Sequence, residues 1–288
     1  MFNAQIERNN YTIDDNIISV LEGGEKYGAP VVFLHGIPAS SELWRGTMTY
    51  LITKGFYCLA PDLSGYGETI VKNARYYDMS YMAELLVQFF HHLGLNEITL
   101  VGHDIGGGIV QILIAKHEQL FVKAVLSNCV TGSSWPIKSV TRMIKASRLG
   151  LFYWMAMAGK FKEDKLYNAL SKTFHRNNLS RSEFDRIFYD GKFNKSRRIR
   201  KFQKMLRRLS SKHTSGNMEL LSKVEIPVDL IWAMNDSFQP WHGPGTTLTS
   251  VLTDCEVFKI ENCGHFLQLE TEREYCDILF NRIAPAIK

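Results

Sequence analysis

Short apolar runs alternate along the chain with longer segments in which apolar residues recur at every third or fourth position. The runs have the length of strands buried on both faces of a parallel sheet, and the longer spacing is typical of amphipathic helices. A short hairpin, with strands at 11–13 and 17–22, opens the chain. Further strands are predicted at residues 30–34, 56–60, 98–102, 122–126, 226–233 and 254–260, and helices at 40–53, 79–93, directly after the strand at 98–102, and from 267 to about 283.

This alternation of strands and helices requires right-handed crossovers. It predicts an α/β protein with a doubly wound, mostly parallel sheet. The alternation stops at Thr131, and residues 133–223 show helical periodicity with no convincing strand. We therefore expect a core domain formed by residues 1–131 and 223–288, and an inserted helical cap formed by residues 132–222.

Charge divides the chain in the same way. Residues 133–222 contain 21 Lys and Arg against 6 Asp and Glu, whereas the rest of the chain contains 13 against 23. The net charge of +5 therefore conceals a cap at +15 and a core at −10. Such asymmetry indicates that the cap is a separate structural unit with a different electrostatic environment.

The candidate chemistry lies where the strand at 98–102 turns into a helix. Gly102 and Gly106 flank Asp104 in a stretch that reads Gly-His-Asp-Ile-Gly. Glycines on both sides permit a turn so tight that the residue at its tip is exposed for reaction, as in the nucleophile elbow of hydrolases. The alternative is that Asp104 caps the following helix, a position that Asp favours.

A carboxylate at the elbow suits a particular reaction. Asp is already ionised at neutral pH, so Asp104 needs no base to attack a saturated carbon. The alkyl ester formed in this way keeps its carbonyl on the protein, where water can hydrolyse it. Serine in the same displacement would form an ether that has no carbonyl to attack.

Two further residues follow Asp104 in the order that such a site requires. Asp236 comes just after the strand at 226–233, and His265 comes in the loop after the last strand. The order nucleophile, acid, histidine is that of hydrolases with an elbow. We expect Asp236 to orient His265, which activates water. The alternative for His265 is a hydrogen-bonded histidine of the core.

The strand at 30–34 ends in His-Gly-Ile-Pro, just before a helix. This is a position where hydrolases place part of the oxyanion hole. We expect the backbone N–H groups of Ile37 and Ile105 to stabilise an oxyanion. A simple turn before the helix is the alternative.

These motifs together resemble the α/β-hydrolase superfamily and, within it, the branch with an aspartate nucleophile. The branch contains epoxide hydrolases, haloalkane dehalogenases and haloacetate dehalogenases. The resemblance covers nearly the whole chain outside the cap and is carried by 35–38 (His-Gly-Ile-Pro), 62–67 (Asp-Leu-Ser-Gly-Tyr-Gly), 102–107 (Gly-His-Asp-Ile-Gly-Gly) and 263–266 (Cys-Gly-His-Phe).

The resemblance implies that the chain opens epoxides to diols through an ester on Asp104. Ring opening requires an acid to protonate the epoxide oxygen, and the cap offers Tyr153, Tyr167, Tyr189 and His175. Hydrolysis of carbon–halogen bonds is the alternative. Haloalkane dehalogenases usually carry Trp after the nucleophile, where this chain has Ile105, and haloacetate enzymes carry a nearby Arg that is absent here. The alternative from another functional class is a non-catalytic protein that binds a ligand on a hydrolase fold.

The expected substrate is a small apolar or amphipathic molecule, held by cap aromatics, together with water. We expect no cofactor and no metal. Five scattered cysteines without a C-x-x-C pair favour reduced thiols and a cytoplasmic location, which agrees with the lack of a signal-like stretch at Met1–Arg8. No apolar run is long enough to span a bilayer.

Residues 195–213 form a basic amphipathic stretch with nine Lys and Arg and no acid. Its apolar stripe most simply packs on the protein and leaves a solvated basic face. Peripheral contact with a membrane, or binding of an anionic substrate, stays open, and no nucleic-acid motif accompanies the charge.

Overall fold

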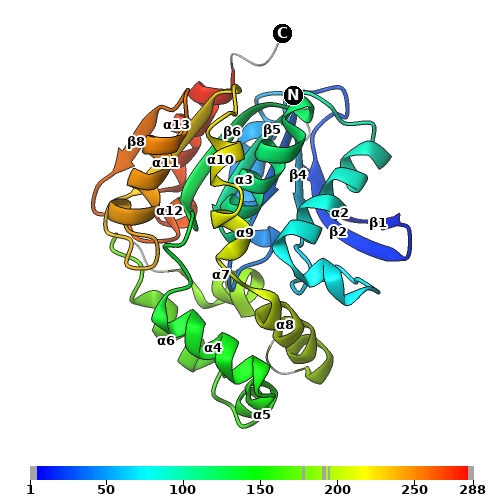
Figure 1. Ribbon diagram of the computed structural model, residues 1–288, viewed down its shortest axis with the longest axis vertical. Coiled ribbons are helices and arrows are strands. Elements are labelled where there is room, and N and C mark those ends of the chain that lie inside the picture. The colour runs from blue at the N-terminus through cyan, green and yellow to red at the C-terminus, as the bar shows by residue number, and fades with distance from the viewer. Residues whose placement is uncertain (1–4, 177–178, 190–192, 194, 285–288) are drawn as a thin grey trace.

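A single mixed sheet forms the centre of the protein in the computed structural model, which describes residues 5–176, 179–189, 193 and 195–284 (Figure 1). The strand order within this part of the chain is β1-β2-β4-β3-β5-β6-β7-β8. The strands are β1 (Ile6–Ile13), β2 (Asn16–Gly23), β3 (Pro30–Leu34), β4 (Tyr57–Pro61), β5 (Ile98–Asp104), β6 (Phe121–Cys129), β7 (Val228–Ala233) and β8 (Val257–Ile260).

The pairing explains why the apolar runs are continuous. In the sheet order, neighbouring strands from β4 to β8 are parallel, and the antiparallel pairs are β1 with β2 and β2 with β4 at one edge. Every residue of β5 is buried, as expected for a strand covered on both faces. The predicted α/β fold with a mostly parallel sheet is confirmed.

Helices cover both faces of the sheet. The helices of the core are α1 (Arg45–Ile52), α2 (Met79–His92), α3 (Ile105–His117), α11 (Thr246–Val251), α12 (Leu267–Glu270) and α13 (Glu272–Ile283), with short 3-10 helices η1 (Ser41–Trp44), η2 (Ala74–Tyr77) and η3 (Glu118–Leu120) and a π-type turn η5 (Trp241–Gly245). On one face α2 packs against α3, and on the other α1 packs against α13. Two hydrophobic clusters, one on each face, form the core.

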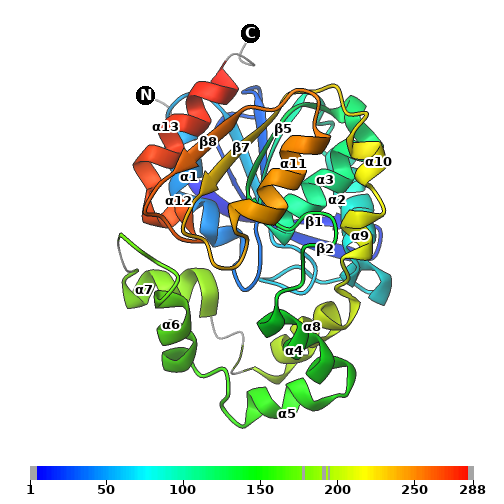
Figure 2. The ribbon, with the colours of Figure 1, turned by 60° about the vertical axis from the view of Figure 1, so that its left-hand side comes forward.

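The inserted region contains helices and no strand within its described residues. Its elements are α4 (Lys138–Arg148), α5 (Leu151–Met157), α6 (Glu163–Ser171), α7 (Arg181–Phe184), η4 (Asp185–Tyr189), α8 (Ser196–Arg208), α9 (Lys212–Ser215) and α10 (Met218–Leu221). Helices α4 to α8 form a layer beyond one end of the sheet, with α5 farthest from it (Figure 2). Helices α9 and α10 pack against α3 of the core instead.

Most predicted elements are present with shifts of one to three residues at their ends. The predicted C-terminal helix is two helices, because Thr271 leaves the helical conformation at φ −127°. Helix α11 was missed, since its Thr-Thr-Leu-Thr-Ser-Val sequence contains four β-branched residues, which have modest helix propensity. The expectation that Met1–Arg8 contains no signal-like stretch concerns in part residues 1–4, which lie outside the described residues.

Candidate active site

Asp104 is the last residue of β5, and α3 begins at the next residue. Its backbone has φ 52° and ψ −123°, a strained conformation for a residue other than glycine. The glycines around it are required by close contacts. A Cβ on Gly106 would lie 2.2 Å from the carbonyl oxygen of Leu34, and one on Gly102 would lie 2.6 Å from the Cα of Gly107. The side chain of Asp104 makes no capping hydrogen bond to α3, so the helix-cap alternative is not what the structure shows.

Backbone amides hold the Asp104 carboxylate in place. The N–H of Ile37 donates to Oδ2 at 2.8 Å, and the N–H of Ile105 also hydrogen-bonds the carboxylate. Gln239 Nε2 lies 3.5 Å from Oδ1. Burial raises the pKa of Asp104 above its ordinary value, and the amides and His265 oppose that rise. The two N–H groups predicted to form an oxyanion hole thus converge on the predicted nucleophile.

His265 and Asp236 form a buried pair. His265 Nδ1 lies 2.7 Å from Asp236 Oδ2, and both side chains are almost completely inaccessible to solvent. Burial alone would raise the pKa of Asp236, but the contact with His265 and the backbone N–H of Phe238 lower it overall. Asp236 therefore remains ionised and engages Nδ1, which leaves Nε2 as the ring nitrogen able to act on water.

The electrostatic surroundings favour a proton on His265. Burial opposes the charged imidazolium, but the carboxylates of Asp236 and Asp104 outweigh that effect and raise the pKa of His265. The influence of both carboxylates shows that the three predicted catalytic residues share one electrostatic environment. Asp104 and His265 also line the same cavity.

Two residues that support this pair were not predicted from the sequence. Asn128, at the end of β6, has a φ of 36° and donates from Nδ2 to Asp236 Oδ2 at 2.9 Å. His103 Nε2 donates to the carbonyl oxygen of His265 at 2.9 Å, and burial lowers the pKa of His103, so it stays neutral. A polar residue at the end of an otherwise apolar strand was the signal that could have identified Asn128.

A cavity of about 230 Å³ lies over Asp104. Its wall is mainly apolar and comes from both domains. The polar side chains in the wall are few, as is common in small-molecule sites. The lining includes Ile37, Asp104, Ile105, Trp135, Ser139, Val140, Met143, Phe161, Leu166, Phe193, Phe238, Gln239 and His265.

The lining only partly matches the aromatic residues that we expected. Trp135 and Phe161 of the cap contribute to the wall. Phe152 is buried within the cap, where its ring centroid lies 4.9 Å from that of Phe161, and Trp154 is exposed. Cap aromatics therefore serve both as pocket wall and as cap core.

The four predicted cap proton donors are not brought to Asp104. None of Tyr153, Tyr167, Tyr189 and His175 is among the described residues that line the cavity. His175 is exposed, and Tyr189 is only half-buried. The face of each short cap helix that turns inward cannot be derived from its sequence, and the role of these four residues as proton donors stays a prediction.

The hydroxyls of two of these tyrosines have partners within the cap. Tyr167 donates to the carbonyl oxygen of Leu179 at 3.1 Å. Tyr153 is hydrogen-bonded to the hydroxyl of Ser196 at 2.8 Å, which connects α5 to α8. These tyrosines therefore stabilise the cap.

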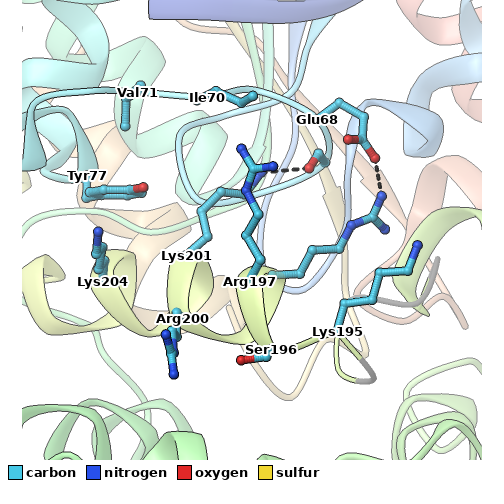
Figure 3. A pocket seen from close by; sticks show the side chains of 12 residues that line it. Glu68, Ile70, Val71, Tyr77, Lys195, Ser196, Arg197, Arg200, Lys201 and Lys204 are labelled. Carbon is cyan, nitrogen blue, oxygen red and sulfur yellow. Dashed lines mark hydrogen bonds and ion pairs between the residues drawn. The ribbon is translucent and has the colours of Figure 1, made fainter.

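A larger hollow of about 740 Å³ lies between α8 and the loop that follows β4 (Figure 3). Lys195, Arg197 and Lys204 line it, and Lys201 donates to the carbonyl oxygens of Gly67 and two neighbouring residues. Burial lowers the pKa of Lys201 to about 8. The described residues that line this groove include no histidine that could pair with a carboxylate as His265 does. The apolar stripe of α8 is buried against the protein, as predicted.

The structure contains no group of three or more His, Cys, Asp or Glu side chains arranged to hold a metal ion within its described residues. In the same residues no helix has the length and apolar character needed to cross a bilayer.

Comparison with known proteins agrees with this geometry. The chain is 36% identical over 110 residues to a haloalkane dehalogenase of Mycolicibacterium paratuberculosis, covering 38% of this chain and 36% of that protein. It is 34% identical over 96 residues to epoxide hydrolase 2 of Siraitia grosvenorii, covering 33% and 30%. Each of these alignments thus spans only about a third of the relative.

Solved structures extend the similarity to the whole fold. The haloalkane dehalogenase DatA from Agrobacterium tumefaciens C58 superimposes with a TM-score of 0.83 over 99% of this chain and 98% of that chain, at 20% identity. At that identity the superposition shows the fold. The sequence profile of the alpha/beta hydrolase fold matches residues 29–272. The chain therefore belongs to the α/β-hydrolase fold family, and its relatives include dehalogenases and epoxide hydrolases.

Proposed function

We propose that this hydrolase uses Asp104 as a nucleophile on a saturated carbon and passes through an alkyl ester. One observation carries the proposal: a buried carboxylate at a strained elbow lies in the same cavity as a histidine that is paired with a second carboxylate. Neither a helix cap nor a satisfied core histidine requires that arrangement.

In the first step, Oδ1 of Asp104 forms a bond to the substrate carbon as the bond to the leaving group breaks. The leaving group takes the bonding electron pair. The N–H of Ile37 holds Oδ2, which leaves Oδ1 as the oxygen for the attack. A fixed carboxylate lowers the entropic cost of reaching the attack geometry.

In the second step, neutral His265 takes a proton from water, and the resulting hydroxide attacks the ester carbonyl. The negative charge that develops on the carbonyl oxygen is stabilised by the same two amides. Asp236 stabilises the imidazolium as it forms. Collapse of the tetrahedral intermediate expels the alkoxide, which takes the proton from His265 and leaves as the alcohol, and loss of the remaining proton to solvent restores the Asp104 carboxylate.

The cavity wall favours a leaving group that departs without a proton. An epoxide oxygen leaves as an alkoxide and needs an acid, whereas a halide needs only hydrogen-bond donors. The described wall contains no tyrosine, but Gln239 provides an amide N–H beside Asp104. This favours cleavage of a carbon–halogen bond in a small apolar haloalkane, with Gln239 as a donor to the halide. Epoxide opening is the second candidate.

The first experiments test whether a covalent ester forms on Asp104. A single turnover in heavy-oxygen water should place the label in the Asp104 side chain, and the His265→Gln variant should accumulate an ester detectable by mass spectrometry. Asp104→Asn should abolish turnover. Asp254→Asn and His242→Gln change the same residue types at exposed positions and serve as matched controls.

A substrate panel then separates the candidates. Release of bromide or chloride from short haloalkanes supports the dehalogenase, and diol formation from styrene oxide supports the epoxide hydrolase. An unlabelled Asp104 after turnover would refute the nucleophile. Substrate binding with no turnover at all would favour the non-catalytic reading.

A further inference from the structure

The tip of the cap carries a concentration of exposed apolar side chains. Large hydrophobic side chains are exposed at eight positions in the described chain, and five of these lie within residues 149–157. Figures 1 and 2 show α5, which contains most of them, at the end of the molecule farthest from the sheet. The five are Leu149 (74% exposed), Leu151 (52%), Trp154 (69%), Met155 (37%) and Met157 (52%).

The packing of α5 explains why these side chains face outward. Phe152 and Ala156 form the inner side of the helix and are buried. The ring of Phe152 lies 5.8 Å from that of Phe202 on α8. Since one side of this short helix is sufficient to attach it to α4 and α8, the apolar residues on its other sides have no role in that packing. An exposed apolar cluster of this kind commonly marks an interaction site.

The same tip also carries several basic side chains. Arg148 immediately precedes the cluster, and Lys160 and Lys162 follow it, all three with exposed side chains. Arg200 on α8 lies over the ring of Tyr153 on α5, with its guanidinium carbon 5.0 Å from the ring centroid. Residues 138–162 and 195–208 contain fourteen Lys and Arg and no Asp or Glu. The positive charge around α5 is therefore not neutralised by acids of these segments.

We propose that this α5 surface, formed by the five apolar residues together with Arg148, Lys160, Lys162 and Arg200, binds the surface of an anionic phospholipid bilayer. Tryptophan favours the boundary between headgroups and acyl chains, and the leucines and methionines enter the apolar region beneath it. Basic side chains surrounding them attract acidic headgroups. The surface thus matches both layers of a bilayer leaflet.

Other kinds of partner would satisfy either the charged or the apolar side chains of the α5 surface, but not both. A nucleic acid would pair with the cations but would leave the five apolar side chains in water or against phosphates. A second copy of this chain would bury the apolar residues but would bring two strongly basic tips together. A bilayer with acidic lipids satisfies both the apolar and the charged groups.

Helix α4 connects the α5 surface to the cavity. Val140 and Met143 of α4 line the cavity over Asp104, and the exposed Lys145 and Arg148 lie on the same helix. An apolar molecule dissolved in the bilayer would therefore reach the cap close to the cavity wall. The approach of a substrate from the bilayer rests on the proposed function, whereas membrane binding does not.

The test measures binding of the full chain to vesicles. Vesicles of phosphatidylcholine with about 30% phosphatidylserine should bind at least about tenfold more tightly than neutral vesicles at low salt, and about 0.5 M salt should weaken that binding. Trp154 is the exposed tryptophan, whereas Trp44, Trp135 and Trp232 are buried. Vesicles should therefore shift tryptophan emission to the blue, brominated lipids should quench it, and Trp154→Phe should remove both effects.

Matched variants separate the two contributions. Trp154→Ala should weaken binding about tenfold, whereas Tyr27→Ala, at a residue that is 84% exposed elsewhere, should not. The triple change Arg148→Glu, Lys160→Glu and Lys162→Glu should abolish the preference for acidic lipid. Lys26→Glu, Lys54→Glu and Lys116→Glu alter the net charge equally at exposed positions of the core and should largely preserve it. Circular dichroism and thermal melting confirm that each variant folds.

Several results would overturn the proposal. One is failure of the unmodified chain to bind acidic vesicles at low salt. Another is equal binding by the tip variants and their controls. Binding of duplex RNA or DNA without binding to vesicles would identify a nucleic-acid surface. Loss of a dimer in Trp154→Ala, without vesicle binding by the unmodified chain, would identify a contact between copies.

Discussion

Asp104 illustrates how much of the candidate site depends on the conformation of single residues. Its φ of 52° belongs to a turn in which the carboxylate reaches the amide of Ile37. Glycine is required on both sides because neighbouring backbone atoms leave no room for a Cβ. These constraints are local in sequence, and for that reason the elbow could be recognised without a structure. Gln239 and Asn128 reach the site through tertiary packing and could not.

At this scale the pH dependence of turnover follows from His265. Ester hydrolysis requires its neutral form, and the carboxylates of Asp236 and Asp104 raise its pKa. The rate should therefore increase with pH through a value above the ordinary histidine pKa of about 6.5. Removing a negative partner destabilises the imidazolium, so Asp236→Asn should move this limb to lower pH and reduce the maximal rate. A limb that stays in place in Asp236→Asn, as it should in the Asp254→Asn control, would contradict the assignment.

Gly36 provides a second prediction for a single residue. A Cβ at this position would lie 2.4 Å from the Cβ of Asp104 and 2.5 Å from its Oδ2. Gly36→Ala should therefore displace the nucleophile from the Ile37 amide and reduce kcat by about a hundredfold. Gly94→Ala is the control: no atom lies within 4 Å, and its φ of 66° makes alanine cost some stability but should leave kcat unchanged. Normal kcat in Gly36→Ala would show that the carboxylate need not be held by that amide.

Among the elements, the loop that carries His265 is attached directly to the cap. Glu270 at the end of α12 is buried and accepts hydrogen bonds from the backbone N–H of Gly264 at 2.9 Å and of His175 at 2.7 Å. The N–H of Arg176 donates to the same carboxylate. One side chain therefore fixes both the histidine loop and a cap segment.

Truncation of this side chain should affect stability and catalysis together. Glu270→Ala leaves buried N–H groups without an acceptor and should reduce the free energy of unfolding by about 2–3 kcal/mol. This corresponds to a decrease in Tm of roughly 5 °C. Turnover should decrease as the histidine loop loosens. Glu261→Ala, at an exposed position near the same loop, should change neither quantity, and a Tm for Glu270→Ala equal to that of this control would exclude the anchoring role.

Prediction from sequence succeeded for elements whose burial produces a clear pattern. Strands β3 and β5 are buried on both faces, so their apolar runs are continuous. Short cap helices bury only part of one side, and their sequence does not specify which side faces the core. The surroundings of Tyr153 and Tyr167 therefore could not be derived from the sequence, while the order of Asp104, Asp236 and His265 followed from the alternation of strands and loops.

Across the whole molecule, stability comes from packing without covalent cross-links. All five cysteines are free, and four of them are buried. Burial raises the pKa of Cys129 to about 12, so its thiol is protonated and unreactive at neutral pH. A reducing agent should therefore leave Tm unchanged, and a thiol reagent should label Cys255, the partly exposed one, before the others. A decrease in Tm under reduction would reveal a cross-link that the structure does not contain.

The two amides at the elbow also make the oxygens of one carboxylate inequivalent. A free aspartate side chain can rotate, so either oxygen can react. Because Ile37 holds Oδ2 at 2.8 Å, the proposed reaction would have its attacking oxygen and its later ester carbonyl oxygen fixed before any substrate arrives. In the proposed reaction the protein therefore needs no rearrangement between forming the ester and breaking it.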